Sequence, residues 1–267
     1  MSRRWQQVRH QLRRNRPAQF SLFVLFIFVV AALCAGLSPY DPDRMALGAR
    51  TLPPDAAHWF GTDEYGRDYF TRALYGGQIS LMVGFLAMLF STLIGTVVGT
   101  VSGYFGGWLD NLMMRAVDIL MAIPAFFLLL VVNAYLKPGV DNIILIISLL
   151  TWMNMSRLVR AETLSVKERE YVLYARASGE HPLRIIVRHI IPGVLPTIIV
   201  AATLNIASAI LMESTLSFLG LGVQAPAASW GSMLNNAQSY IGEASWLAMF
   251  PGILILLTVF SFNVLGD

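Results

Sequence analysis

Side chains that could carry out chemistry are few in this sequence, and they do not cluster. All four histidines lie outside the long apolar runs, so none can act as the base for a nucleophile inside a membrane. The sequence has no His-Glu-x-x-His motif or similar ligand cluster, so we expect no metal site. These patterns argue against an intramembrane protease and against a metal-dependent enzyme. The histidines are His10, His58, His181 and His189.

The sequence also lacks a phosphate-binding loop of the common type. Its only two lysines are Lys137 and Lys167, and neither lies in a Gly-x-x-x-x-Gly-Lys-[Ser/Thr] pattern, whose backbone cradles nucleotide phosphates. We therefore predict that this chain is not itself an ATPase of this kind and binds no cofactor of its own. Energy from ATP would have to come from a partner protein.

Glu213 is the one acidic residue well inside an apolar run. An ionisable side chain within a membrane is a functional candidate by default, because burying it in hydrocarbon is costly. Glu213 could line a path for a solute, or it could bond to a neighbouring helix, and the sequence favours neither alternative. Further polar residues that could line a path are Asn133, Asn154 and Asn205.

The charged segment 160–179 stands between long apolar runs and carries too many full charges to lie in hydrocarbon. Ser165 and Glu168 have the spacing of a capping box, which predicts that a helix begins there. Gly179 suits the left-handed residue that ends a helix, and Pro182 suits the first turn of a second short helix. The sequence therefore predicts two short helices held against the membrane face.

The first of these helices is expected to be displayed outside the membrane. Val172, Ala175 and Gly179 fall on one stripe, whose small residues would allow close docking into a groove of another protein. The alternative is a solvated connecting helix that lies on lipid headgroups. Docking is the favoured interpretation, and the alternative remains open.

Long apolar helices must position these residues. Of the residues, 56% are hydrophobic and only 13% are charged, about half the usual share of roughly 25% in soluble domains. A helix needs about 20 apolar residues to cross the hydrocarbon, and backbone groups in lipid must be paired internally. The predicted fold is therefore an all-α membrane protein with six transmembrane helices. The spans are about 20–37, 81–102, 113–135, 142–158, 194–219 and 246–264.

The first apolar run could instead be a cleaved signal peptide. Its length and the five runs that follow it favour a retained helix. Basic residues are concentrated in segments 1–19 and 157–192, which predicts that both termini and the 157–192 loop are cytoplasmic. The loops 38–78 and 220–245 then face outside. Because the basic residues flank the membrane, we expect no nucleic acid as a partner. The basic residues on the outer side are Arg44, Arg50, Arg67, Arg72 and Lys137.

Glycine recurs every four residues in the second span, at Gly95, Gly99 and Gly103. Small residues on one face let another helix approach closely, so we predict helix packing here in preference to a role in a pore.

Two further features concern the third span. Pro124 is expected to bend it or to free a carbonyl. Arg115 and Asp118 are three residues apart and could form an ion pair on the same helix.

The segment Tyr174-Ala175-Arg176-Ala177-Ser178-Gly179, followed by nine residues and then His189-Ile190-Ile191-Pro192, resembles the EAA loop of bacterial ABC importer permeases. Tyr174 and Ser178 depart from the residues usual in that loop. Four further stretches, in the expected order, are similar to the dipeptide/oligopeptide permease C branch of this family, and the likeness runs over nearly the whole chain. These stretches are 58–68, 184–192, 216–222 and 262–267.

The resemblance implies a type I ABC importer transmembrane domain with a cytoplasmic coupling helix. It divides the chain into a basic cytoplasmic tail (1–19), a first transmembrane helix with its extracytoplasmic loop (20–77) and a core domain (78–267) whose coupling loop spans about 160–192. It also implies a short basic tail beyond Asp267. The residues expected to couple to the ATPase are Glu170, Tyr171, Tyr174, Ala175, Ala177 and Gly179.

The implied function is that of a permease subunit in an ATP-driven importer of short peptides. The implied partners are a homologous second permease subunit, two cytoplasmic ABC ATPase subunits that bind ATP and Mg, and an extracytoplasmic solute-binding protein. Three alternatives remain. They are a secondary transporter driven by ion gradients, a permease for a non-peptide solute such as a nickel complex or glutathione, and a structural membrane scaffold.

Overall fold

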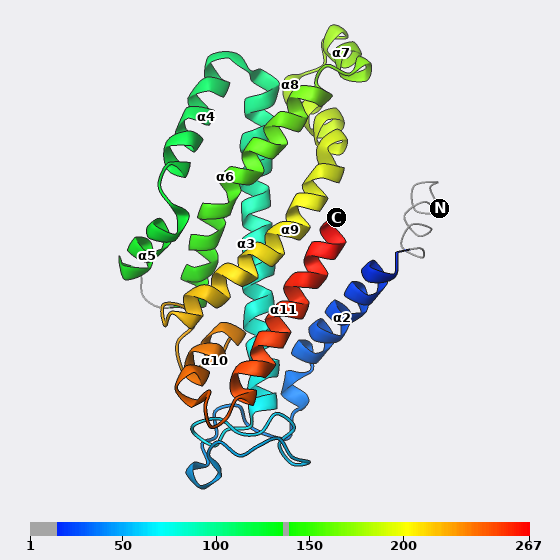
Figure 1. Ribbon diagram of the computed structural model, residues 1–267. Coiled ribbons are helices and arrows are strands. Elements are labelled where there is room, and N and C mark those ends of the chain that lie inside the picture. The colour runs from blue at the N-terminus through cyan, green and yellow to red at the C-terminus, as the bar shows by residue number, and fades with distance from the viewer. Residues whose placement is uncertain (1–14, 136–138) are drawn as a thin grey trace.

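The computed structural model describes residues 15–135 and 139–267, so the arginines before Asn15, and Lys137, lie outside the described part. The described part is a bundle of helices whose only β-pairing is an isolated bridge between Thr62 and Asp68 (Figure 1). This confirms the predicted all-α membrane class. Among the described residues, five helical segments are long and apolar enough to cross a membrane. They are α2 (Arg16–Leu33), α3 (Tyr69–Phe105), α6 (Val140–Val166), the run Pro182–Phe218 and α11 (Trp246–Gly266).

The third predicted span, 113–135, is not one continuous helix. It consists of the end of α4 (Gly107–Met121) and of α5 (Ala125–Tyr135), separated by the break before Ala125. Pro124 lacks a backbone N–H and disfavours a helical conformation at the residue before it, which explains the break. The bend predicted at Pro124 is therefore confirmed, whereas the prediction of a single helix was wrong. In Figure 1, α4 and α5 follow one another along the same side of α6.

The central helix α3 is longer than predicted. Its 37 residues span about 55 Å, which exceeds the roughly 30 Å of hydrocarbon in a bilayer. The helix begins at Tyr69 because the Asp68 carboxylate accepts a hydrogen bond from the backbone N–H of Thr71 at 2.7 Å. The predicted loop 38–78 therefore ends about ten residues earlier than expected. Apolar runs reveal the part of a helix that crosses lipid, but not the part that projects beyond it.

The glycine stripe of α3 brings this helix into backbone contact with α6. A Cβ atom added to Gly95 would lie 2.6 Å from the Met155 Cβ, and one added to Gly99 would lie 2.5 Å from the Ser156 carbonyl oxygen. These distances are too short for any side chain larger than hydrogen. The predicted close packing at this stripe is confirmed.

Charged groups join α3, α4 and α6 at the end of the bundle where α3 turns into α4. The Asp110 carboxylate accepts hydrogen bonds from the Arg160 Nε at 2.5 Å and Nη2 at 2.6 Å, and it also pairs with Ser102. The hydrogen bonds from Arg160 lower the pKa of Asp110 below its usual value. Asp118 pairs with Arg157 of α6, so its predicted pairing with Arg115 was wrong. An ion pair between helices holds α4 in place here.

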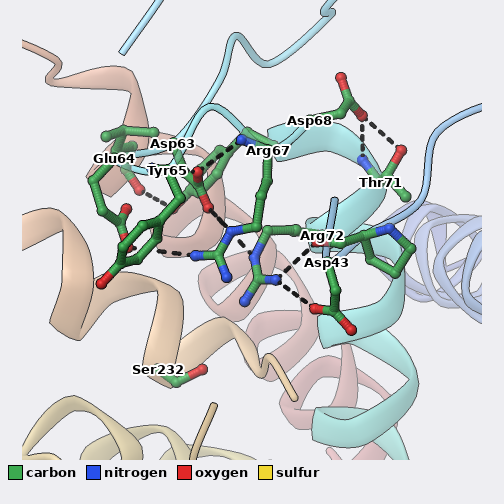
Figure 2. Close-up of polar contacts among 12 residues, drawn as sticks. Asp43, Asp63, Glu64, Tyr65, Arg67, Asp68, Thr71, Arg72 and Ser232 are labelled. Carbon is green, nitrogen blue, oxygen red and sulfur yellow. Dashed lines mark hydrogen bonds and ion pairs between the residues drawn. The ribbon is translucent and has the colours of Figure 1, made fainter. Parts of the chain in front are cut away.

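At the opposite end, the loop between α2 and α3 is a folded cap, with buried charges at its centre. Figure 2 shows Arg67 and Arg72 together, with three carboxylates around them. Arg67 Nε lies 2.6 Å from Asp63 Oδ2, and Arg72 Nη1 lies 3.1 Å from Asp43 Oδ1. Burial raises the pKa of Glu64, the third carboxylate. Both arginines are almost fully buried, so this network fixes the loop conformation.

The cap is attached to α11 as well as to α3. The Tyr69 hydroxyl donates to the Leu247 carbonyl at 2.6 Å, and the Phe60 ring stacks on Phe250 with 3.9 Å between centroids. Helix α10 (Trp230–Ala237) packs nearby at the same end of the bundle. The loop is thus a structured part of the fold.

We predict that Gly99→Ala destabilises the bundle by about 1–3 kcal/mol, because its Cβ would overlap the α6 backbone. The matched control is Gly252→Ala in α11, where an added Cβ meets nothing within 4 Å. Thermal melting of the purified protein in detergent measures both effects. Equal melting temperatures for the two variants would show that the stripe does not hold α3 against α6.

Candidate functional site

Helix α7 (Glu170–Ala177) stands apart from the bundle at the end opposite the folded cap (Figure 1). It begins after a short link that follows α6. The predicted capping box was wrong, because Ser165 lies inside α6 and α7 starts after Arg169 without a side-chain cap. Val166 is fully buried, and its packing stabilises α6 as far as Val166. The helix therefore continues through Ser165, where the capping-box pattern predicted that a new helix would begin.

The end of α7 follows the sequence prediction. Gly179 has φ +77°, and its N–H donates to the Arg176 carbonyl at 3.1 Å. The Glu180 N–H donates to the Ala175 carbonyl, also at 3.1 Å. Together these bonds form a Schellman motif, which reverses the chain sharply. Pro182 then opens α8 (Pro182–Ile185), as predicted.

One face of α7 is buried against its own chain. Val172 and Ala175 pack in a cluster with Val166, Ile185 and Ile190. The stripe that we expected to dock into a partner is therefore the face that holds α7 on the bundle. This part of the prediction was wrong, because the sequence does not reveal which side of an amphipathic helix its own chain covers.

The opposite face of α7 is exposed and carries large apolar side chains. Tyr174 is 76% exposed, and Leu173 beside it is 44% exposed. Sequence reasoning missed Leu173, although its i+3 position from Glu170 and i−4 position from Ala177 would have placed it on the same face. Of the residues expected to couple to an ATPase, Ala175 is buried and the others are exposed. The exposed ones are Glu170, Tyr171, Tyr174, Ala177 and Gly179.

Helix α8 continues directly into a long membrane helix. A π-helical turn, η3 (Ile186–Ile190), joins it to α9 (Ile191–Phe218), and Pro192 and Pro196 lie within this helical run. Glu180, at the joint between α7 and α8, accepts a hydrogen bond from His189 of this π-helical turn at 3.1 Å. This hydrogen bond connects the end of α7 to the helical run that continues into α9.

Glu213 lies in α9 and is completely buried. Its two carboxylate oxygens accept hydrogen bonds from Ser217 at 2.7 Å and from Ser80 of α3 at 3.0 Å. The Ser80 oxygen in turn accepts the backbone N–H of Trp230 at the start of α10. This geometry matches the alternative in which Glu213 bonds across helices.

The asparagines proposed for a path lie on different helices. Asn154 of α6 is exposed, and Asn205 of α9 is half-buried. Neither side chain makes a hydrogen bond with another residue in the described ranges. Asn205 lies about 12 Å along α9 from Glu213, so the two side chains do not form one cluster. Asn133 belongs to α5, and its side chain lies outside the described part of the structure.

Potential metal ligands are dispersed in the described part of the chain. No group of three or more His, Cys, Asp or Glu side chains comes together there.

Comparisons with known proteins agree with this arrangement. Residues 91–267 match the family described as binding-protein-dependent transport system inner membrane component. Residues 3–54 match the N-terminal TM domain of oligopeptide transport permease C.

Curated relatives are similar over nearly the whole chain. The dipeptide transport system permease protein DppC of Bacillus subtilis is 44% identical over 96% of this chain and 81% of its own length. The oligopeptide transport system permease protein OppC of Escherichia coli is 41% identical over 98% of this chain and 88% of its own length. The OppC protein of Bacillus subtilis is 38% identical over 98% of this chain and 87% of its own length. The helical bundle, its displayed helix and these matches together assign the chain to the family of inner membrane components of binding-protein-dependent transport systems, the permease subunits of ABC transporters.

Proposed function

We propose that this chain is a permease subunit of an importer that moves short peptides into the cell at the expense of ATP. The observation that carries the proposal is the two-sided exposure of α7. One face carries exposed aromatic and apolar side chains that a partner can contact, and the other face is buried against the rest of this chain. The names of the relatives, which refer to dipeptide and oligopeptide transport, support short peptides as the solute.

In this proposal the exposed face of α7 docks into a cytoplasmic ATPase subunit. Tyr174, Leu173 and Tyr171 supply the apolar contact, and Glu170 supplies charge at the start of the helix. Aromatic side chains on an exposed face are typical of the residues that dominate binding energy at interfaces. Two such ATPases bind ATP and Mg, and their closure moves α7 on each permease subunit.

Motion of α7 reaches the membrane through the cluster beneath it. Val172 and Ala175 belong to one buried cluster with residues of α6, α8 and α9, so a displacement of α7 is transmitted to these helices. ATP binding can favour an outward-open state only because the ATPase binds that state more tightly than the inward-open one. The solute then crosses between this subunit and a homologous second permease subunit.

The folded cap and α10 form the surface proposed for the extracytoplasmic solute-binding protein. They lie at the end of the bundle opposite α7, which fits a cytoplasmic α7 and cytoplasmic termini in the inner membrane (Figure 1). The buried ion pairs of Arg67 and Arg72 keep this surface rigid, so a docked protein meets a preformed shape. Basic residues on the α7 side of the membrane support the same orientation.

Co-purification with the ATPase tests the docking step. Tyr174→Ala should reduce the amount of ATPase recovered with the permease, because it removes the most exposed ring of the α7 face. Trp108→Ala is the matched control, since Trp108 is also 76% exposed but lies in α4. Equal recovery with both variants would argue against docking through α7.

Uptake by the reconstituted complex tests the transport step. Proteoliposomes that contain both permease subunits, the ATPases and the binding protein should take up dipeptides or short oligopeptides only when ATP reaches the ATPases. Uptake driven by an ion gradient without ATP would favour a secondary transporter. Competition by glutathione or a nickel complex, but not by peptides, would assign a different solute to the same fold.

Gly179→Val should uncouple ATP hydrolysis from uptake while the complex still assembles. A β-branched residue at φ +77° costs about 1–2 kcal/mol, so the Schellman turn would open and α7 would lose its fixed direction. Gly179→Asn is the control, because asparagine tolerates this conformation and an added Cβ atom meets no atom within 4 Å. The ratio of ATP hydrolysed to peptide imported measures the effect. Equal ratios for the two variants would contradict this role of Gly179.

Glu213→Gln should lower stability and leave transport per folded complex unchanged. Both carboxylate oxygens accept hydrogen bonds, and an amide offers only one acceptor, so we expect a loss of about 1–3 kcal/mol. Ser217→Ala, which removes the shorter of these bonds, should act in the same direction. Thermal melting and uptake at matched protein amounts separate the two roles. A transport defect without a change in melting would return Glu213 to the translocation path.

A further inference from the structure

A side-chain pair outside the docking face connects α7 to the membrane helix that follows it. Glu180 lies directly after the Schellman turn, and His189 lies in the π-helical turn η3. The His189 Nε2 stands 3.1 Å from Glu180 Oε2. A carboxylate only accepts hydrogen bonds, so the imidazole donates here through Nε2–H. Both side chains are largely buried, with exposed fractions of 18% for Glu180 and 26% for His189.

His189 also contacts the first turn of α7. Its ring centroid lies 6.3 Å from that of Tyr171, with 45° between the ring planes. One residue of η3 therefore touches α7 near its beginning through Tyr171 and just beyond its end through Glu180. Two contacts separated by the length of a helix define its direction, whereas a single contact would leave it free to pivot.

The segment that carries His189 is itself unusual. The Ile191 N–H donates to the Ile186 carbonyl, which is the i→i+5 bond of a π-helix. Pro192, which comes next, has no N–H to continue an α-helical ladder, and this favours the wider turn. Single π turns inside α-helices are rare overall, and those that occur are often found at functional sites. Their extra residue lets the hydrogen-bond register shift.

We propose that Glu180 and His189 are positioning residues for coupling, which hold α7 at a fixed angle to α9 across the π turn. The inference rests on the proposed function, because it assigns these residues to the transmission of motion from the ATPase. With the pair intact, displacement of α7 pulls η3 and therefore α9. With the pair broken, α7 pivots about the Gly179 turn, and ATP is hydrolysed with less transport.

The test measures ATP hydrolysed per peptide imported by the complete reconstituted complex. Glu180→Ala should raise this ratio by roughly three- to tenfold, the change in an equilibrium that one hydrogen bond of ordinary strength produces. Glu180→Gln keeps an acceptor for the His189 N–H and should restore a ratio close to that of the unmodified chain. A residue that only supports folding would instead alter the amount of complex and leave the ratio unchanged.

Two further variants complete the design. Arg184→Gln is the matched control, because the Arg184 Nε lies 4.0 Å from the Glu180 carboxylate and its side chain is 68% exposed, so we expect no change in the ratio. His189→Ala should reproduce the effect of Glu180→Ala, and the double variant should be no worse than either single one. If Glu180→Ala does not accumulate, the His189→Ala ratio decides the question alone.

The outcomes distinguish this inference from the proposed function. ATP-independent uptake by the unmodified complex would overturn the proposed function itself. ATP-dependent uptake whose ratio is unaffected by Glu180→Ala and His189→Ala would overturn only the positioning role. Additive effects in the double variant would also overturn it, because they would show that the two residues act separately.

Discussion

The backbone contact between α3 and α6 is the interaction on which the rest of the bundle depends. Lipid chains are as apolar as leucine, so burying apolar surface gives little drive for helices to associate inside a membrane. Close van der Waals contact must supply it, and the stripe from Gly95 to Gly103 permits that contact. Once α6 is fixed against α3, it positions α4 through the Asp110–Arg160 pair and positions α7 through the short link after Val166.

The two ends of the bundle are stabilised by different kinds of interaction. At the α10 end, buried ion pairs around Arg67 and Arg72 link the folded cap to α3, and the stacking of Phe60 on Phe250 links it to α11. Buried charges are costly unless they are paired, so such a network permits few conformations. At the α7 end, the Glu180–His189 hydrogen bond and a π turn connect a helix that stands apart from the bundle. The α10 end is therefore a surface fixed by paired buried charges, and the α7 end is a helix connected to the bundle through two turns.

The amino-acid sequence was sufficient for features that depend on neighbouring residues. Apolar runs predicted the membrane helices, because backbone groups in lipid must pair within one segment. Gly179 and Pro182 predicted the turn after α7, because each backbone conformation there suits few residue types. The spacing of Gly95 and Gly99 predicted a close helix contact. Pro124 predicted a bend, although not that the predicted third span would divide into two helices.

Tertiary structure alone decided which distant residues meet. Val166 packs in the cluster under α7, and this burial carried α6 past the capping signal at Ser165. The same cluster turned Val172 inward and left Tyr174 exposed, because a helix faces its own chain with whichever side fits the neighbouring helices. Glu213 could not be assigned from the sequence, since its role depends on serines of α3 and α9 that only the folded bundle brings to it.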